Sequence, residues 1–145
     1  LGVFRLQPDG TVDLVCNTMT RPNGIAFSPD QKKLYVAQSD PNEPILKVFN
    51  VLEDGRLDAG MTFFDATTLT ERRKGNPDGL AVDVQGNLFA TGPGGVLVIS
   101  PDGTHLGTIL TGQKTANCCF GEDGRSLFIT ADMYLCRIRL ATRGW

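Results

Sequence analysis

Asparagine or aspartate begins each of three similar segments, and oxygen-bearing residues at such recurring positions could bind a metal ion. Asn23 begins NGIAFSPDQKKLYVA, Asp78 begins DGLAVDVQGNLFAT, and Asn117 begins a weaker copy, NCCFGEDGRSLFIT. In each copy an apolar stretch, a turn and a second apolar stretch follow. A polar residue that returns at the same place in each repeat predicts side chains that converge on one axis. We therefore interpret Asn23 and Asp78 as ligands of one cation site and Asn117 as a pocket residue.

The two proposed ligands have a definite chemistry. Hard cations such as Ca²⁺ and Mg²⁺ prefer oxygen ligands, and here Asp78 offers a carboxylate and Asn23 a neutral amide oxygen. This mixture leaves net positive charge at the site, which could polarise a carbonyl group and lower the pKa of a bound water. A carboxylate beside the metal could then take the proton. The alternative is structural, because Asn and Asp before Gly are common turn residues.

Short apolar segments separated by Gly and Pro turns predict an all-β fold, and an internal repeat of about four strands favours a β-propeller over a sandwich. The connection at 66–74 could form a single helical turn. The expected strands, grouped by blade, are 2–6 and 11–16; 24–27, 33–38, 45–51 and 56–64; 80–84, 87–91, 95–100 and 105–110; and 118–120, 126–131 and 135–140.

These groups of two, four, four and three strands make roughly three blades within one domain, residues 1–145, or half of a six-bladed ring. Closed propellers have typically four to eight blades, so half a ring leaves exposed strand edges. We therefore expect a homodimer, in which two copies related by a two-fold axis along the channel complete about six blades. A second Asp78 would then face the same channel.

Composition excludes several classes of protein. The net charge is −2, and the absence of a basic patch argues against binding nucleic acid. No apolar run approaches the roughly 20 residues of a membrane helix, and the first residues lack the features of a signal peptide, so we expect a cytoplasmic protein that binds no membrane. Position 1 is Leu1 rather than Met, which leaves open whether a longer chain exists.

The four cysteines and the single histidine do not suggest a metal centre of their own. Cys16, Cys118, Cys119 and Cys136 form no CxxC pair, and His105 stands alone, which argues against structural zinc. We expect buried, reduced thiols, with Cys118 and Cys119 on opposite faces of one strand. Two further groups are interpreted as structural: Asp83 and Asp132 as turn or channel-rim residues, and Arg72, Arg73 and Lys74 as a solvated loop face.

Three stretches together resemble the gluconolactonase and regucalcin (SMP-30) family: RPNGIAFSPDQKKLYVAQSD, NPDGLAVDVQGNLFATGPGGVLVISPDG and TANCCFGEDGRSLFIT. The resemblance runs through nearly the whole chain and corresponds to the C-terminal half of a family member. It implies a six-bladed propeller with one divalent cation in its channel and, in many members, hydrolysis of sugar lactones or related esters. It also implies that Asn23 is a metal ligand and that Asp78 is both ligand and general base. A glutamate ligand that the family takes from its first blade has no counterpart here.

The predicted function is therefore that of a metal-dependent lactonase-like hydrolase. The resemblance favours Ca²⁺, with Mg²⁺, Zn²⁺ and Mn²⁺ as alternatives, a small-molecule lactone as substrate and Asn117 in the substrate pocket. One alternative is a non-catalytic half-propeller that binds or assembles but lacks part of the site. Another is a sugar-binding or protein-interaction propeller without a metal.

Overall fold

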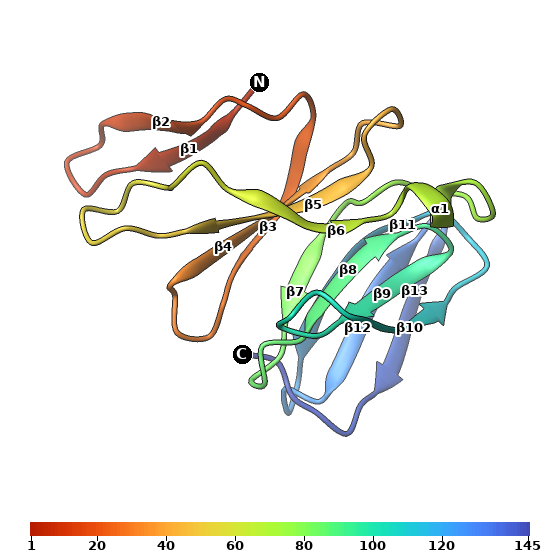
Figure 1. The fold of residues 1–145 in the computed structure, drawn as a ribbon. Helices are drawn as coiled ribbons and strands as arrows, with labels where there is room; N and C mark the ends of the chain where they lie inside the picture. The colour runs from red at the N-terminus through yellow and green to blue at the C-terminus, as the bar shows by residue number, and fades with distance from the viewer.

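The predicted alternation of apolar stretches and turns forms thirteen antiparallel strands in four sheets (Figure 1). The computed structural model describes all residues, 1–145. The first sheet is a hairpin, and the strand order of each of the others follows the chain. The sheets comprise β1 (Val3–Leu6) and β2 (Val12–Cys16); β3 (Pro22–Phe27), β4 (Lys33–Gln38), β5 (Ile45–Asn50) and β6 (Met61–Asp65); β7 (Leu80–Val82), β8 (Leu88–Gly92), β9 (Gly95–Ile99) and β10 (His105–Leu110); and β11 (Thr115–Gly121), β12 (Ser126–Ala131) and β13 (Tyr134–Arg139).

The three larger sheets fan out from the line where their first strands β3, β7 and β11 meet, and the hairpin β1–β2 lies beside the sheet of β3–β6 (Figure 1). Each gap between neighbouring sheets holds its own apolar core. Successive side chains of β8 point alternately into two of these cores. Leu88 and Ala90 face the sheet of β3–β6, while Phe89 faces the sheet of β11–β13. Successive strand residues point to opposite faces, so a sheet packed on both sides is buried along its middle strands. This arrangement confirms the predicted blades of two, four, four and three strands.

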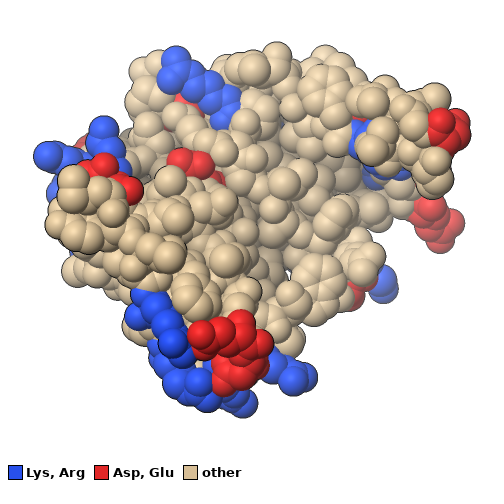
Figure 2. All heavy atoms as spheres, turned by 180° about the vertical axis from the view of Figure 1, so that it is seen from behind, with Lys and Arg blue, Asp and Glu red and all other residues tan.

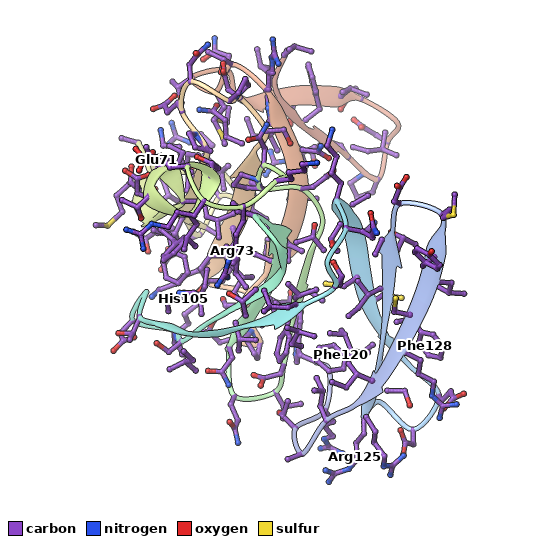
Figure 3. The ribbon with its side chains drawn as sticks, turned by 90° about the vertical axis from the view of Figure 1, so that its right-hand side faces the viewer. Glu71, Arg73, His105, Phe120, Arg125 and Phe128 are labelled. Atoms are coloured by element: carbon purple, nitrogen blue, oxygen red, sulfur yellow. The ribbon has the colours of Figure 1, made fainter.

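The fourth sheet, β11–β13, has one packed face and one open face (Figure 3). Phe120 lies edge-on to Phe89 of the neighbouring sheet, with ring centroids 5.2 Å apart. Phe128 pairs with Cys119 on the other face, where the Arg137 guanidinium lies 5.9 Å from the centroid of the Phe128 ring.

The face of the molecule opposite that of Figure 1 has charged side chains around its margin and an uncharged middle (Figure 2).

Gly24 and Gly79 allow the first strands β3, β7 and β11 to lie very close together. A Cβ at Gly24 would stand 2.9 Å from the carbonyl carbon of Asp78, and one at Gly79 would stand 2.8 Å from Cα of Asn117. Neither glycine has a left-handed φ. Their missing side chains thus serve to permit the close approach of neighbouring strands rather than an unusual backbone conformation.

The predicted helical turn is α1 (Thr67–Thr70), which begins where the Asp65 carboxylate accepts a hydrogen bond of 2.8 Å from Thr67 N. At four residues it is far too short to cross a membrane, and no other helix is present. The cysteines are free; Cys16 and Cys118 are buried as expected, but Cys119 is exposed on the open face of the fourth sheet. Burial raises the pKa of the Cys118 thiol to about 12.

Candidate functional site

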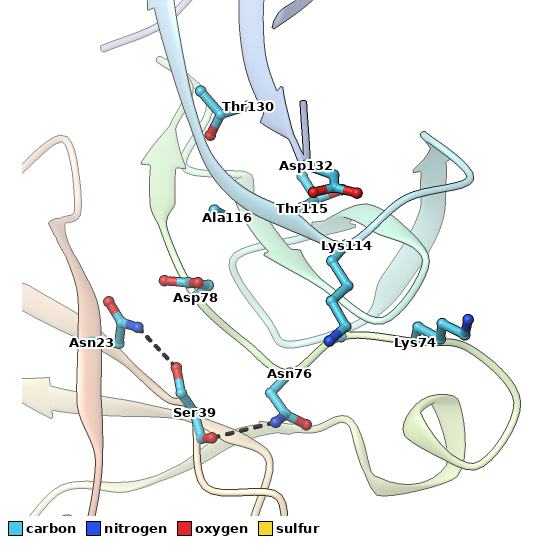
Figure 4. A pocket seen from close by; sticks show the side chains of 11 residues that line it. Asn23, Ser39, Lys74, Asn76, Asp78, Lys114, Thr115, Ala116, Thr130 and Asp132 are labelled. Carbon is cyan, nitrogen blue, oxygen red and sulfur yellow. Dashed lines mark hydrogen bonds between the residues drawn. The ribbon is translucent and has the colours of Figure 1, made fainter. Parts of the chain in front are cut away.

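A polar cavity of about 600 Å³ opens where the first strands of three sheets begin (Figure 4). Asn23 on β3 and Asp78 just before β7 both line it, as the repeat predicts. Gly24 brings these two positions together. It has no side chain, so β3 can approach the backbone of Asp78 closely. The full lining is Asn23, Ser39, Lys74, Gly75, Asn76, Asp78, Lys114, Thr115, Ala116, Thr130 and Asp132.

Ser39 fixes the orientation of the Asn23 amide in the cavity. Ser39 Oγ donates a hydrogen bond of 2.6 Å to the carbonyl oxygen of Pro77, so this hydroxyl can only accept from Asn23. Asn23 Nδ2 donates to it at 3.0 Å (Figure 4). The amide nitrogen is therefore directed at Ser39, and the amide oxygen has no hydrogen-bond partner in the chain. A bulge in β3 between Pro22 and Ile25 sets the direction of this side chain.

Asp78 is a half-buried carboxylate without an ion-pair partner, since the four ion pairs of the chain all lie elsewhere. Partial burial raises the pKa of the Asp78 carboxyl above its ordinary value, and the nearby Asn23 amide opposes that rise. A partly buried carboxylate without a cationic partner, such as that of Asp78, favours binding of a cation.

Backbone hydrogen bonds hold the loop of Asp78 between two sheets. Asp78 N donates to Thr91 O, and Gly79 N donates to Ala116 O, both at 2.9 Å. The fully buried Thr91 hydroxyl lies 3.1 Å from Gly79 O and 3.0 Å from Ala116 O. Thr91 thus ties β8 to the starts of β7 and β11, so the Asp78 side chain projects from a fixed backbone.

Asn117 lies beside this site without lining the cavity. Its Oδ1 accepts a hydrogen bond of 2.9 Å from Cys118 N, and its backbone packs against Gly79. Its neighbours Thr115 and Ala116 reach the cavity instead. A bulge between Thr115 and Asn117 displaces this part of β11 relative to β12. The pocket role of Asn117 stays a prediction, as do the ligand and base roles of Asn23 and Asp78.

Sequence reasoning missed Ser39 and the lysines of the cavity. Ser39 follows β4, and no motif marks it, because its role depends on a hydrogen bond to a carbonyl that is 38 residues away. Lys74 is exposed, as expected for a solvated loop, yet it lines the cavity together with Lys114. Asp132 lies at the rim, as expected, whereas Asp83 is buried in a turn where it accepts hydrogen bonds from the backbone of Gln85 and Asn87.

The oxygen donors in the cavity suit a hard cation, but they do not complete its coordination. Asp78 and Asn23 offer two ligand side chains, and no cluster of three or more His, Cys, Asp or Glu occurs in the chain. Ca²⁺ takes six to eight oxygen ligands in proteins. Further ligands would have to be water, substrate or another polypeptide segment.

Four-stranded antiparallel sheets arranged around a common line, with polar side chains meeting where their first strands begin, define part of a β-propeller. Residues 2–132 match the model of the SMP-30/Gluconolactonase/LRE-like region. This match covers most of the chain, which therefore belongs to the SMP-30/gluconolactonase family.

Similar proteins include a gluconolactonase from Zymomonas mobilis, which is 45% identical over 99% of this chain and 41% of its own length. The structure of a gluconolactonase from Xanthomonas campestris is 35% identical, with a TM-score of 0.84 over 96% of this chain and 44% of that one. A calcium-binding protein, regucalcin, from Agrobacterium tumefaciens has a TM-score of 0.72 at 22% identity, covering 93% of this chain and 50% of that one, which shows the fold alone. The chain thus spans about half the length of these proteins or less.

Proposed function

We propose that this chain supplies part of a metal-dependent site for the hydrolysis of sugar lactones or related esters. The observation that carries the proposal is the half-buried, unpaired carboxylate of Asp78 beside the oriented Asn23 amide in one cavity. The identity of 45% with a gluconolactonase over almost the whole chain supports lactone chemistry at that cavity.

In this proposal, Asn23 and Asp78 hold a divalent cation through oxygen atoms, and Ca²⁺ is the first candidate. When bound, such a cation polarises the lactone carbonyl and favours attack by water. Asp78 accepts the proton that the attacking water loses. Ser39 holds the Asn23 amide in one orientation, because its hydroxyl accepts a hydrogen bond from Asn23 Nδ2.

The proposal extends to assembly, because both ends of the row of sheets expose apolar side chains. The hairpin β1–β2 exposes Phe4, Leu6, Val12 and Leu14, and β13 exposes Tyr134, Leu135 and Ile138. Burying such surface against a second copy would stabilise a ring and bring a second Asp78 to the channel. Sedimentation at micromolar concentration tests this part: a dimer supports it, and a stable monomer contradicts it.

Hydrolysis of glucono-1,5-lactone, followed by titration of the released acid in the presence of Ca²⁺, tests the reaction. Asp78→Asn should reduce the rate by orders of magnitude with the fold intact, because removal of a general base typically costs a factor of about 10²–10⁴. Asp9→Asn, in the turn of the first hairpin, is the matched control. Full activity in Asp78→Asn would remove Asp78 from the mechanism. Calcium binding without hydrolysis by the unchanged chain would favour the non-catalytic alternative.

A further inference from the structure

A second hollow of about 580 Å³ adjoins the cavity of Asp78 and shares Lys74, Lys114 and Asp132 with it. Figure 4 shows the two lysines on neighbouring loops, on the side of the cavity away from Asn23. Arg73, on the loop that follows α1, lines the second hollow (labelled in Figure 3). One bound molecule could therefore occupy both spaces.

The charge around this second hollow, here called the basic hollow, is unbalanced. Arg73, Lys74 and Lys114 line it against the single carboxylate of Asp132, which leaves a local charge of +2 in a chain whose net charge is −2. None of the three cations takes part in an ion pair. Like charges around one space repel each other, and a bound anion would relieve that repulsion.

The backbone under these side chains is fixed, so the basic hollow is not a chance grouping on mobile loops. Gly94 N donates a hydrogen bond of 2.9 Å to Lys74 O, and the stem of Arg73 packs directly on Gly94. On the other side, the hydroxyls of Thr111 and Thr115 lie 2.7 Å apart and close the turn that carries Lys114. Binding an anion would then order side chains but not loops, which lowers the entropic cost.

We propose that the basic hollow binds a phosphate group of the substrate, so that the lactone hydrolysed at Asp78 is a phosphorylated sugar lactone. A phosphate monoester carries about −1.5 to −2 charges at pH 7, which matches the local charge of +2. Guanidinium and ammonium groups are the side chains that bind phosphate oxygens most strongly. The assignment of the substrate rests on the proposed function, whereas the anion site itself rests only on Arg73, Lys74 and Lys114.

Titration calorimetry with 6-phosphogluconate and gluconate tests the proposal, with a chelator present so that no metal contributes. These probes differ by the phosphate group. The unchanged chain should bind 6-phosphogluconate about tenfold or more tightly than gluconate, the effect of one or more charge-assisted hydrogen bonds. Raising the salt concentration should weaken this preference, because the pocket is open to solvent.

The variant Lys74→Ala/Lys114→Ala should lose the preference, and the control Lys32→Ala/Lys33→Ala, which removes two remote charges from exposed positions, should keep it. Equal binding of the two probes by the unchanged chain, or a preference that survives the loss of Lys74 and Lys114, would overturn the proposal. Because the titration needs neither metal nor turnover, a failure of lactone hydrolysis would contradict the proposed function without affecting this result.

Discussion

Replacing Gly24 by alanine should separate two of the innermost strands and disturb the candidate metal site. The new Cβ would meet the carbonyl oxygen of Asp78 and stand 2.9 Å from both the carbonyl carbon of Asp78 and Cα of Gly79. Ordinary contacts of a Cβ begin at 3.4 Å. The neighbours are backbone atoms, which cannot rotate away, so β3 and β7 must move apart by at least half an ångström, the difference between these two distances.

The size of the effect follows from two opposing contributions. Overpacking by one methyl group typically costs about 1–3 kcal/mol. The φ of Gly24 lies outside the left-handed region, so alanine adds no backbone strain there, and its smaller entropy in the unfolded chain returns about 0.4–1 kcal/mol. We therefore expect Gly24→Ala to lower the free energy of unfolding by about 1.3 kcal/mol, the difference between the midpoints of these two ranges.

Gly107→Ala is the matched control, since nothing lies within 4 Å of the position that its new methyl group would take, and its φ also lies outside the left-handed region. Urea unfolding followed by circular dichroism measures both variants, and the expected result is a neutral or stabilised Gly107→Ala beside a destabilised Gly24→Ala. Gly24→Ala should also bind Ca²⁺ more weakly, because Asp78 moves relative to Asn23. Equal stability and equal Ca²⁺ affinity in the two variants would refute the role given to Gly24.

Three further predictions concern Asp78, Ser39 and Thr91. Folding raises the pKa of Asp78 above its ordinary 3.8, so the folded chain holds this proton more tightly than the unfolded chain does. The contribution of Asp78 to the free energy of unfolding therefore falls as the pH rises from 3.8 through the pKa of the folded chain. The metal-free variant Asp78→Asn should therefore gain stability relative to the unchanged chain across that window, and urea unfolding at pH 3 to 7 in a chelator checks the sign. Ser39→Ala frees the Asn23 amide to rotate and should weaken Ca²⁺ binding by about 10–100-fold in calorimetry, as loss of a partner that orients a ligand does elsewhere. Thr91→Val keeps the shape of the buried side chain but removes the hydroxyl that lies beside Gly79 O and Ala116 O. This change should lower the free energy of unfolding by about 1–3 kcal/mol, which thermal or urea unfolding measures.

The strands and their grouping could be predicted because their signals are local. Alternating apolar residues and Gly or Pro turns mark each blade, and the repeat of Asn23 and Asp78 marks where the first strands begin. The same repeat could not show that Asn117 would bond to the neighbouring Cys118 nitrogen and lie outside the cavity lining. That outcome depends on a bulge in β11, whose register against β12 the sequence does not reveal.

Contacts between sheets could not be predicted from the sequence either, because they depend on how residues of different repeats pack together. Ser39 acts through the Pro77 carbonyl, and Gly24 acts by leaving room for the backbone of Asp78, a residue of the next repeat. Arg73, Lys74 and Lys114 look like ordinary solvated loop residues until the sheets bring their two loops to one hollow. Local pattern predicts the blades, whereas the site depends on how the blades meet.

Calorimetric titration of Ca²⁺ into the purified, chelator-treated chain tests the central claim most directly, since that claim is a cation site formed by Asn23 and Asp78. The unchanged chain and the control Asp9→Ala should bind Ca²⁺ with the same affinity, and Asp78→Ala should show no binding at the same concentrations. Binding that persists unchanged in Asp78→Ala, or an unchanged chain that binds no divalent cation, would contradict the account.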